Sequence, residues 1–275
     1  MKIILFFFFL LQFFTVYAQN SISNSDKDSL DQLISDLVKS QKKEKNSDDS
    51  LRNIKKKGKK LVVIDPGHGG KDPGTISGKL YEKDIVLKLA KKIEKLAKNY
   101  DNIEVKLTRD KDVFLPLEER ALIANRLEGD LFISLHANSY KDRTVGGMEL
   151  YHLDNTRDEY TDKLARVENR ISENTSLLDT ILVDMTMNYY VGDSLDYAKE
   201  IGEGLEKNLK KYSVKLRGYN KGALFYVLVG ARMPSLLFEI GYVTNKTDRE
   251  LLQRDEYLES VAKSLLDSIS KSNVK

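Results

Sequence analysis

Residues 61–70 read LVVIDPGHGG, an apolar run that ends in aspartate, proline and a histidine between glycines. A short run of β-prone apolar residues closed by turn-forming residues is typical of a buried strand. Residues 131–138, LFISLHAN, repeat the pattern, so His68 and His136 both stand where a predicted strand leaves its sheet. Open α/β sheets build their sites at that edge, and the pair therefore predicts a shared metal. His152, the third histidine, also ends a predicted strand, but nothing around it suggests a site, and we expect it to be structural or exposed.

Strands and helices alternate along the rest of the chain. Apolar residues at three-to-four spacing predict helices within 85–96, 117–127, 198–212 and 258–269. Strands alternating with helices predict one α/β domain, residues 61–272, with a mostly parallel sheet covered by helices on both faces. The predicted strands are 61–65, 103–108, 131–136, 147–152, 224–227 and 235–240.

One stretch exceeds a minimal α/β unit. Residues 154–192 are predicted to form two helices, 160–171 and 177–188, separated by a polar break at 172–176. An insertion of this length at the active edge of a sheet is usually a lid, a binding element or a regulatory segment. Ordinary additional packing is the alternative, which periodicity alone does not exclude.

The first residues have the pattern of an export signal. Lys2 precedes an apolar stretch, 3–16, and the small-residue sequence 16–18 follows, so we interpret 1–18 as a cleaved signal peptide. The stretch is shorter than the roughly 20 apolar residues of a membrane span, which makes an uncleaved anchor the less favoured reading. With no cysteine after the cleavage site, a lipoprotein anchor is excluded. We expect an exported, periplasmic protein with no membrane span after cleavage.

The charge is concentrated in the segment that follows. The net charge is +3, but residues 39–60 carry ten Lys or Arg against three Asp or Glu, and residues 1–38 carry two Lys against four Asp, which leaves −2 for residues 61–275. We interpret 19–60 as a solvated polar, basic linker; the alternative is a segment that contacts an anionic wall or membrane surface. The domain itself has no basic footprint for nucleic acid, and we expect no nucleic-acid partner.

Without cysteine, a metal site must use histidine and carboxylate, which favours zinc and requires a third protein ligand beside the two histidines. Glu82 is the best candidate, because it begins a predicted helix at the end of the loop that follows His68. A first-turn glutamate stabilised by the helix dipole explains it about equally well. Glu239 lies inside a predicted buried strand, where an ionised carboxylate is costly unless it is paired or functional. It could act as a general base on a water molecule, or form a buried ion pair with Arg232 or Lys246.

Four segments together resemble one enzyme family. Residues 65–70, Glu82, 134–138 and 238–245 are similar to the motifs of zinc-dependent N-acetylmuramoyl-L-alanine amidases of the bacterial cell-separation type. The resemblance covers about 61–269. It implies a twisted six-stranded sheet and hydrolysis of the amide between N-acetylmuramic acid and L-alanine in peptidoglycan, for wall remodelling and daughter-cell separation.

The same resemblance assigns roles to the candidate residues. It implies one zinc ion held by His68, Glu82 and His136, with Glu239 as the catalytic carboxylate. Two other functions remain open at this point. One is a zinc peptidase that cuts within wall peptides, and the other is a non-catalytic wall-binding or partner-docking module that keeps the fold.

The insertion also has a counterpart in that family. Residues 164–169, LARVEN, and 181–185, ILVDM, resemble the segment by which cell-division amidases block their own zinc cleft until a protein activator moves it. This implies a regulatory glutamate near the zinc, for which we expect Glu168, with Glu173 as the competitor. The chain lacks a folded wall-binding domain ahead of residue 61, so we expect a partner to supply targeting. No substrate-binding residue is predicted.

Overall fold

The computed structural model describes residues 58–154, 159–169 and 177–274. The predicted signal peptide, most of the linker and Glu173 lie outside the described residues. The elements in chain order are β1 (Lys60–Pro66), β2 (Ile76–Ser77), β3 (Leu80–Tyr81), α3 (Glu82–Ala97), β4 (Ile103–Leu107), α4 (Leu117–Arg126), β5 (Leu131–Asn138), β6 (Met148–Leu153), α5 (Glu159–Asn169), α6 (Leu177–Asn208), the 3₁₀ turn η3 (Lys210–Tyr212), β7 (Leu216–Ala223), the 3₁₀ turn η4 (Tyr226–Leu228), β8 (Ser235–Tyr242), α7 (Lys246–Leu252) and α8 (Asp255–Lys271).

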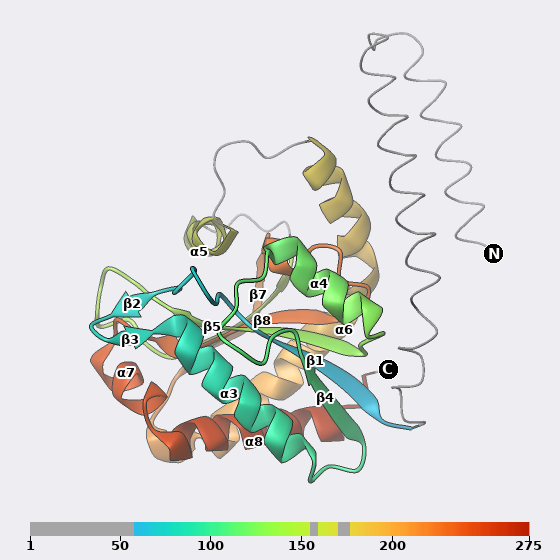
Figure 1. Ribbon diagram of the computed structural model, residues 1–275. Helices are drawn as coiled ribbons and strands as arrows, with labels where there is room; N and C mark the ends of the chain where they lie inside the picture. The colour runs from blue at the N-terminus through green and yellow to red at the C-terminus, as the bar shows by residue number, and fades with distance from the viewer. Residues whose placement is uncertain (1–57, 155–158, 170–176, 275) are drawn as a thin grey trace, which may run out of the picture. The chain divides into compact units, whose positions relative to one another are not determined.

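A six-stranded sheet in the order β4-β1-β5-β8-β6-β7 organises the domain (Figure 1). β1 pairs in parallel with β4 and β5, and β8 is parallel to β5. β6 runs antiparallel to β8 and carries β7 in parallel on its outer side. The predicted mostly parallel α/β sheet is confirmed, and the carboxyl ends of β1, β5 and β8 meet at one edge.

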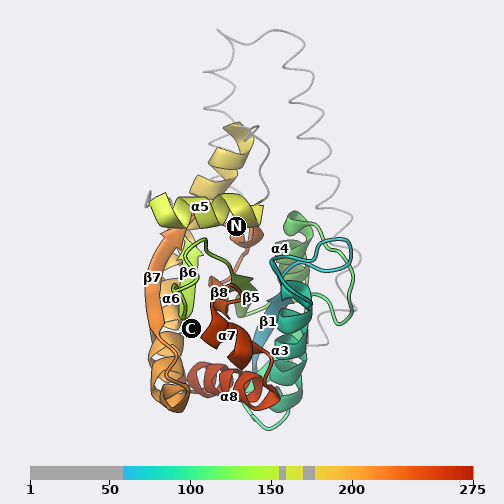
Figure 2. The same ribbon diagram turned by 90° about the vertical axis from the view of Figure 1, so that its left-hand side faces the viewer.

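Helices cover both faces of the sheet, as predicted. On one face, buried apolar residues of α3, α6 and α8 pack on the strands in one core. On the other face, a smaller core joins α4, α5 and η4 to the sheet. α5 lies across the strand ends at the site edge rather than along a strand (Figure 2). Among the described elements, α5 thus lies over the edge of the sheet at which the parallel strands end.

Two predicted elements differ from the structure. The predicted strand 224–227 is wrong: the strand is β7, and the apolar run after it turns through η4 and buries Phe225, Val227 and Leu228 under α4 and α5. The sequence pattern does not predict β7, because this edge strand, LRGYNKGA, contains polar residues and glycines. The apolar run after it is buried by side-chain packing and does not pair with a strand. The predicted helix 177–188 is also not separate, since α6 continues through Gly192, whose position has open space around it.

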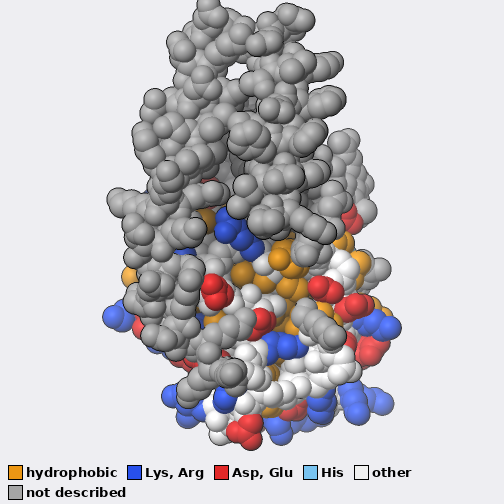
Figure 3. Space-filling model, turned by 90° about the vertical axis from the view of Figure 1, so that its right-hand side faces the viewer, with side chains coloured by type: hydrophobic (Ala, Val, Ile, Leu, Met, Phe, Trp, Pro, Cys, Tyr) orange, Lys and Arg blue, Asp and Glu red, His pale blue; other side chains and the backbone are white. Residues whose placement is uncertain are grey.

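The described surface has two further properties. Over the coloured part of the face in Figure 3, lysine and arginine side chains are interspersed with aspartate and glutamate. Among the described helices, none combines the length and apolar character needed to cross a bilayer.

Candidate metal centre and active site

Four buried side chains converge at the site edge. His68 lies in the loop after β1, Glu82 is the first residue of α3, His136 is on β5 and Glu168 is on α5. One nitrogen or oxygen atom from each lies within 4.8 Å of the others, which is the spacing of a metal-binding group. The structure therefore brings together the three residues predicted as ligands and the predicted regulatory glutamate.

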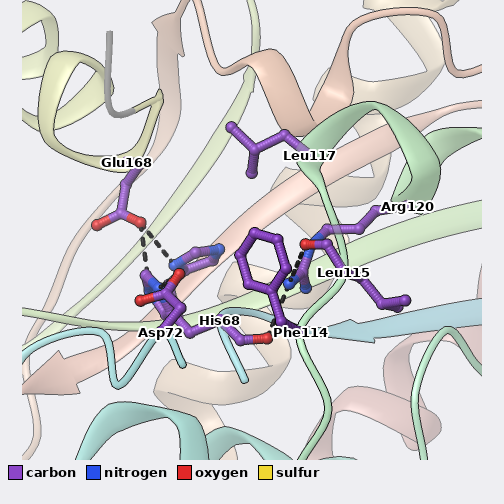
Figure 4. A pocket seen from close by; sticks show the side chains of 8 residues that line it. His68, Asp72, Phe114, Leu115, Leu117, Arg120 and Glu168 are labelled. Atoms are coloured by element: carbon purple, nitrogen blue, oxygen red, sulfur yellow. Dashed lines mark hydrogen bonds and ion pairs between the residues drawn. The ribbon is translucent and has the colours of Figure 1, made fainter. Parts of the chain in front are cut away.

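The facing atoms form a closed ring of nitrogens and oxygens. Glu82 Oε1 lies 3.0 Å from His68 Nε2 and 3.2 Å from His136 Nδ1. Glu168 Oε2 lies 2.9 Å from His136 Nδ1 and 3.5 Å from His68 Nε2 (Figure 4). His68 Nε2, His136 Nδ1 and Glu168 Oε2 nevertheless have no hydrogen-bond partner of acceptable geometry. Buried polar atoms that face one another without hydrogen bonds fit a cation between them.

The charges of the four side chains in the ring also favour a bound cation. Burial lowers the pKa of both imidazoles, but Glu82 for His68 and Glu168 for His136 outweigh it, and the pKa of each histidine rises to about 10. The same pairing holds the pKa of Glu82 below its usual value against the effect of burial. Two carboxylates thus retain two imidazolium protons. A divalent cation replaces those two protons charge for charge, as expected when metal binding displaces protons from its ligands.

Neighbouring side-chain and backbone groups orient the ligand atoms. Asp72 Oδ2 lies 3.0 Å from His68 Nδ1, which leaves Nε2 to face the ring. Glu82 is fixed by backbone donors, because the amide of Ala137 donates to Oε1 at 2.8 Å and that of Thr75 donates to Oε2 at 2.7 Å. Close approach at Gly67 requires glycine, since a Cβ there would stand 2.7 Å from the ring of His136.

Two buried arginines hold the His68 loop, and the sequence reasoning missed both. Arg120, 1% exposed, donates to the carbonyls of Pro66 at 2.9 Å and His68 at 2.8 Å. Arg109 donates to the carbonyls of Pro66 at 2.8 Å and Gly67 at 2.7 Å. Each loop carbonyl therefore receives a charged donor, which fixes the turn that carries the histidine.

Asp65 supplies the counter-charge for this arrangement. Its carboxylate accepts from Arg120 at 2.9 Å, from Ser134 at 2.7 Å and from Thr108. Burial alone would raise the pKa of Asp65, but Arg120 and the two hydroxyl donors hold it below its usual value. An aspartate inside a predicted buried strand was the signal that could have identified this network, since such a charge requires a partner.

Glu239 lies beside the ring but outside it. It is fully buried on β8, and its Cα pairs in register with that of His136 on β5. Burial first, and the charge of Glu168 second, raise the pKa of Glu239 well above its usual value. Neither carboxylate oxygen has a hydrogen-bond partner among the described residues, so the alternative ion pair with Arg232 or Lys246 is not formed.

His152 takes no part in the ring. It is buried at the end of β6, and its Nε2 lies 3.7 Å from Asp154 Oδ2. Burial lowers its pKa against the effect of that carboxylate.

A second carboxylate cluster adjoins Glu239 and was also missed. Glu149 on β6 is fully buried and pairs in register with Glu239. Its Oε1 accepts from Lys221 at 2.5 Å and Arg217 at 3.3 Å. Its Oε2 accepts from the hydroxyls of three tyrosines, Tyr242 at 2.6 Å, Tyr151 at 3.0 Å and Tyr160 at 3.1 Å. The argument that singled out Glu239, a carboxylate within a buried strand, applies equally to Glu149.

α5 is fastened to this edge along its whole length. Tyr160 near its start reaches Glu149, and Glu168 near its end reaches the two histidines. Between them, Leu164 and Ala165 are buried in the second core. Asn169 closes the helix against η4: its amide donates to the carbonyl of Leu224 at 2.6 Å and accepts from the amide of Tyr226 at 2.7 Å.

A family model described as N-acetylmuramoyl-L-alanine amidase matches residues 62–271. The chain belongs to the N-acetylmuramoyl-L-alanine amidase family.

Individual relatives align over about three quarters of the chain. The endolysin of Bacillus phage SPP1 is 35% identical over 213 residues, which are 77% of this chain and 65% of the endolysin. The N-acetylmuramoyl-L-alanine amidase AmiA of Escherichia coli is 31% identical over 224 residues, 77% of this chain and 75% of AmiA. The solved structure of the N-acetylmuramoyl-L-alanine amidase AmiC2 of Nostoc punctiforme has a TM-score of 0.57 at 32% identity, and covers 77% of this chain and 96% of that one. The chain thus spans a little under two thirds of the endolysin and three quarters of AmiA.

Proposed function

We propose that this chain is a zinc-dependent N-acetylmuramoyl-L-alanine amidase that hydrolyses the bond between N-acetylmuramic acid and L-alanine in peptidoglycan. Membership of the amidase family supports the reaction. The observation that carries the proposal is the buried ring of His68, Glu82, His136 and Glu168, in which the facing atoms of both histidines and of Glu168 lack hydrogen bonds. Its biological role is wall remodelling and separation of daughter cells, and its location is the periplasm after removal of a signal peptide, 1–18.

His68, Glu82 and His136 are the proposed zinc ligands. Two imidazole nitrogens and one carboxylate oxygen are a donor set of catalytic zinc sites, which leave a fourth position open. Zinc bound there would supply Lewis-acid chemistry to the scissile carbonyl. The protein's own contribution is to fix His68 through Asp72, and Glu82 through the backbone amides of Thr75 and Ala137.

Glu239 is the proposed catalytic carboxylate. It lies beside His136 in register, and its oxygens have no other partner among the described residues. A buried carboxylate with a raised pKa can take a proton from an attacking water molecule and return it to the leaving amine of L-alanine.

We further propose that α5 restrains the enzyme until a protein activator displaces it. Glu168 Oε2 lies 2.9 Å from His136 Nδ1, so its carboxylate would be available as a further ligand to a bound zinc ion, and α5 lies across the strand ends. With α5 docked, the carboxylate of Glu168 would compete with substrate. Residues 154–192 would then be the regulatory insertion within a catalytic domain of 61–272.

The test is a digest of purified sacculi with product identification. The zinc-loaded Glu168→Ala protein should release stem peptides that begin with a free L-alanine amine, and chelator should abolish the release. Glu239→Gln in that background should lower the rate by at least about 100-fold while zinc content is unchanged. Glu118→Gln, an exposed glutamate on α4, is the matched control and should leave the rate unchanged.

Other products would refute the proposal. Cleavage within the wall peptides would identify a zinc peptidase, and the absence of both zinc and product in the Glu168→Ala protein would identify a binding module. Normal cleavage by Glu239→Gln would show that the assigned role of Glu239 is wrong.

A further inference from the structure

The start of α5 contacts a cluster of polar side chains beside the proposed active site. We call this cluster the Glu149 cup; it consists of Glu149, Tyr151, Arg217, Lys221 and Tyr242. The hydroxyl of Tyr160 enters it, hydrogen-bonding to Glu149 and Tyr242, and the ring of Tyr160 lies 5.1 Å from Lys221 Nζ. A helix that covers a cleft has therefore placed one side chain on the metal-binding ring and another in a second site.

The cup itself holds two cations and one carboxylate. Arg217 and Lys221 both contact the same oxygen of Glu149, Oε1. Their side chains remain 36% and 24% exposed, so neither is sealed from solvent by the protein. Outside the cup, the charge of Arg217 also acts on the carboxylate of Asp248, whereas Lys221 has Glu149 as its ion-pair partner.

Departure of Tyr160 would change this balance in a defined way. Glu149 Oε2 would still accept from Tyr151 and Tyr242, so the carboxylate would stay satisfied. Lys221 would lose the cation–π contact that α5 supplies through Tyr160 and keep only the longer one, 5.7 Å to the ring centroid of Tyr151. Without Tyr160, the cup would offer the donors of Arg217 and Lys221 to a ligand. The group that fits these donors is an anion, such as a carboxylate.

The distance between the Glu149 cup and the metal-binding ring matches the length of two or three peptide residues. Glu149 and His136 flank Glu239 in register on neighbouring strands. Two strand spacings of about 4.8 Å place the cup about 10 Å from His136. An extended peptide advances about 3.4 Å per residue, so a carboxylate on the second or third residue after the scissile amide would reach that far.

We propose that the Glu149 cup is a substrate subsite that binds a carboxylate of the stem peptide, two or three residues beyond the scissile amide, and that Tyr160 fills it while α5 is docked. The proposal rests on the proposed amidase function. Arg217 and Lys221 determine specificity in it, and Glu149 positions them.

The test uses the full zinc-loaded chain with Glu168→Ala to uncover the site. Its substrates are soluble N-acetylmuramoyl tetrapeptides whose free carboxylate at the second or at the third residue is replaced by a carboxamide. We expect kcat/KM to fall about tenfold for one of the two amidated substrates, the loss of one charge-assisted hydrogen bond. Arg217→Gln should remove most of that preference through KM, whereas Lys215→Gln, which removes a neighbouring exposed charge outside the cup, should keep it.

A binding measurement does not depend on turnover. Calorimetry with the free tetrapeptide should show that Tyr160→Ala, in a chain that retains Glu168, gains several-fold more affinity for the acidic peptide than for its amidated form. This variant also serves if Arg217→Gln does not fold. Equal rates on all three substrates, an equal effect of Arg217→Gln and Lys215→Gln, or unchanged affinity in Tyr160→Ala would overturn the proposal. Failure to cleave sacculi at all would instead refute the amidase function.

Discussion

Asn169→Ala should activate the enzyme without touching the proposed active site. The side chain makes two hydrogen bonds that tie the end of α5 to η4, at 2.6 and 2.7 Å. At about 1 kcal/mol each, their loss weakens docking of the helix by about 2 kcal/mol. If the undocked form is a minor state, its population rises by about 30-fold, since each 1.4 kcal/mol is a factor of ten. The initial rate of dye release from labelled sacculi should rise by the same order.

Asn125→Ala is the matched control. Asn125 on α4 makes the same pair of bonds to a neighbouring loop, donating to the carbonyl of Gly230 and accepting from the amide of Arg232, both at 2.8 Å. Its removal should cost comparable stability and leave the rate unchanged. A folded, zinc-loaded Asn169→Ala protein with the wild-type rate would show that α5 does not limit activity, and the restraint assigned to it would have to be abandoned.

Three further predictions concern the ring and its support. Gly67→Ala should weaken zinc affinity at least about tenfold in a competition titration, because the added methyl group displaces His136. Gly192→Ala, at a position with open space, is the control. Equal zinc affinities of the two variants would contradict this packing argument. Folding lowers the pKa of Asp65, so its carboxylate stabilises the folded state above the unfolded pKa of ~3.9, and this stabilisation is lost as the pH falls through the folded pKa. Asp65→Asn should therefore make the stability less dependent on pH in acid unfolding followed by circular dichroism. An unchanged pH dependence would refute this role of Asp65. Chelation should lower the melting temperature by about 5–10 °C, reversibly with zinc, since a ligand at ~100 times its Kd adds ~2.7 kcal/mol; a melting temperature insensitive to chelator would argue against a metal in the folded protein.

The parts of the site that could be anticipated from sequence lie at element boundaries. His68 and His136 close apolar runs, and Glu82 opens an amphipathic helix after the His68 loop, so parallel pairing of β1 and β5 is enough to bring them near one another. Hydrophobic periodicity locates such boundaries because it reflects burial directly. The mostly parallel sheet followed from the same alternation.

The parts that could not be anticipated depend on which element crosses which. Arg109 and Arg120 donate hydrogen bonds to the His68 loop although they lie more than forty residues away in the sequence. Nothing in their local sequence distinguishes them from surface arginines. Glu149 stands next to Glu239 only because β6 inserts antiparallel beside β8. β7 was misplaced because an edge strand with polar residues has no apolar pattern to reveal it.

The length of α5 indicates that its two contacts would act together in the proposed restraint. Its 11 residues are fewer than the roughly 12–15 that an isolated helix needs to be even marginally stable in water. Its helical form therefore depends on docking through Tyr160, the buried Leu164 and Ala165, and Asn169. Tyr160 and Glu168 are about two turns apart, ~12 Å along a helix, which is close to the ~10 Å between the Glu149 cup and His136. Under the proposed restraint, a partner that removed any one anchor would weaken the helix that positions the others, so that the carboxylate of Glu168 would leave the ring and Tyr160 would leave the cup together.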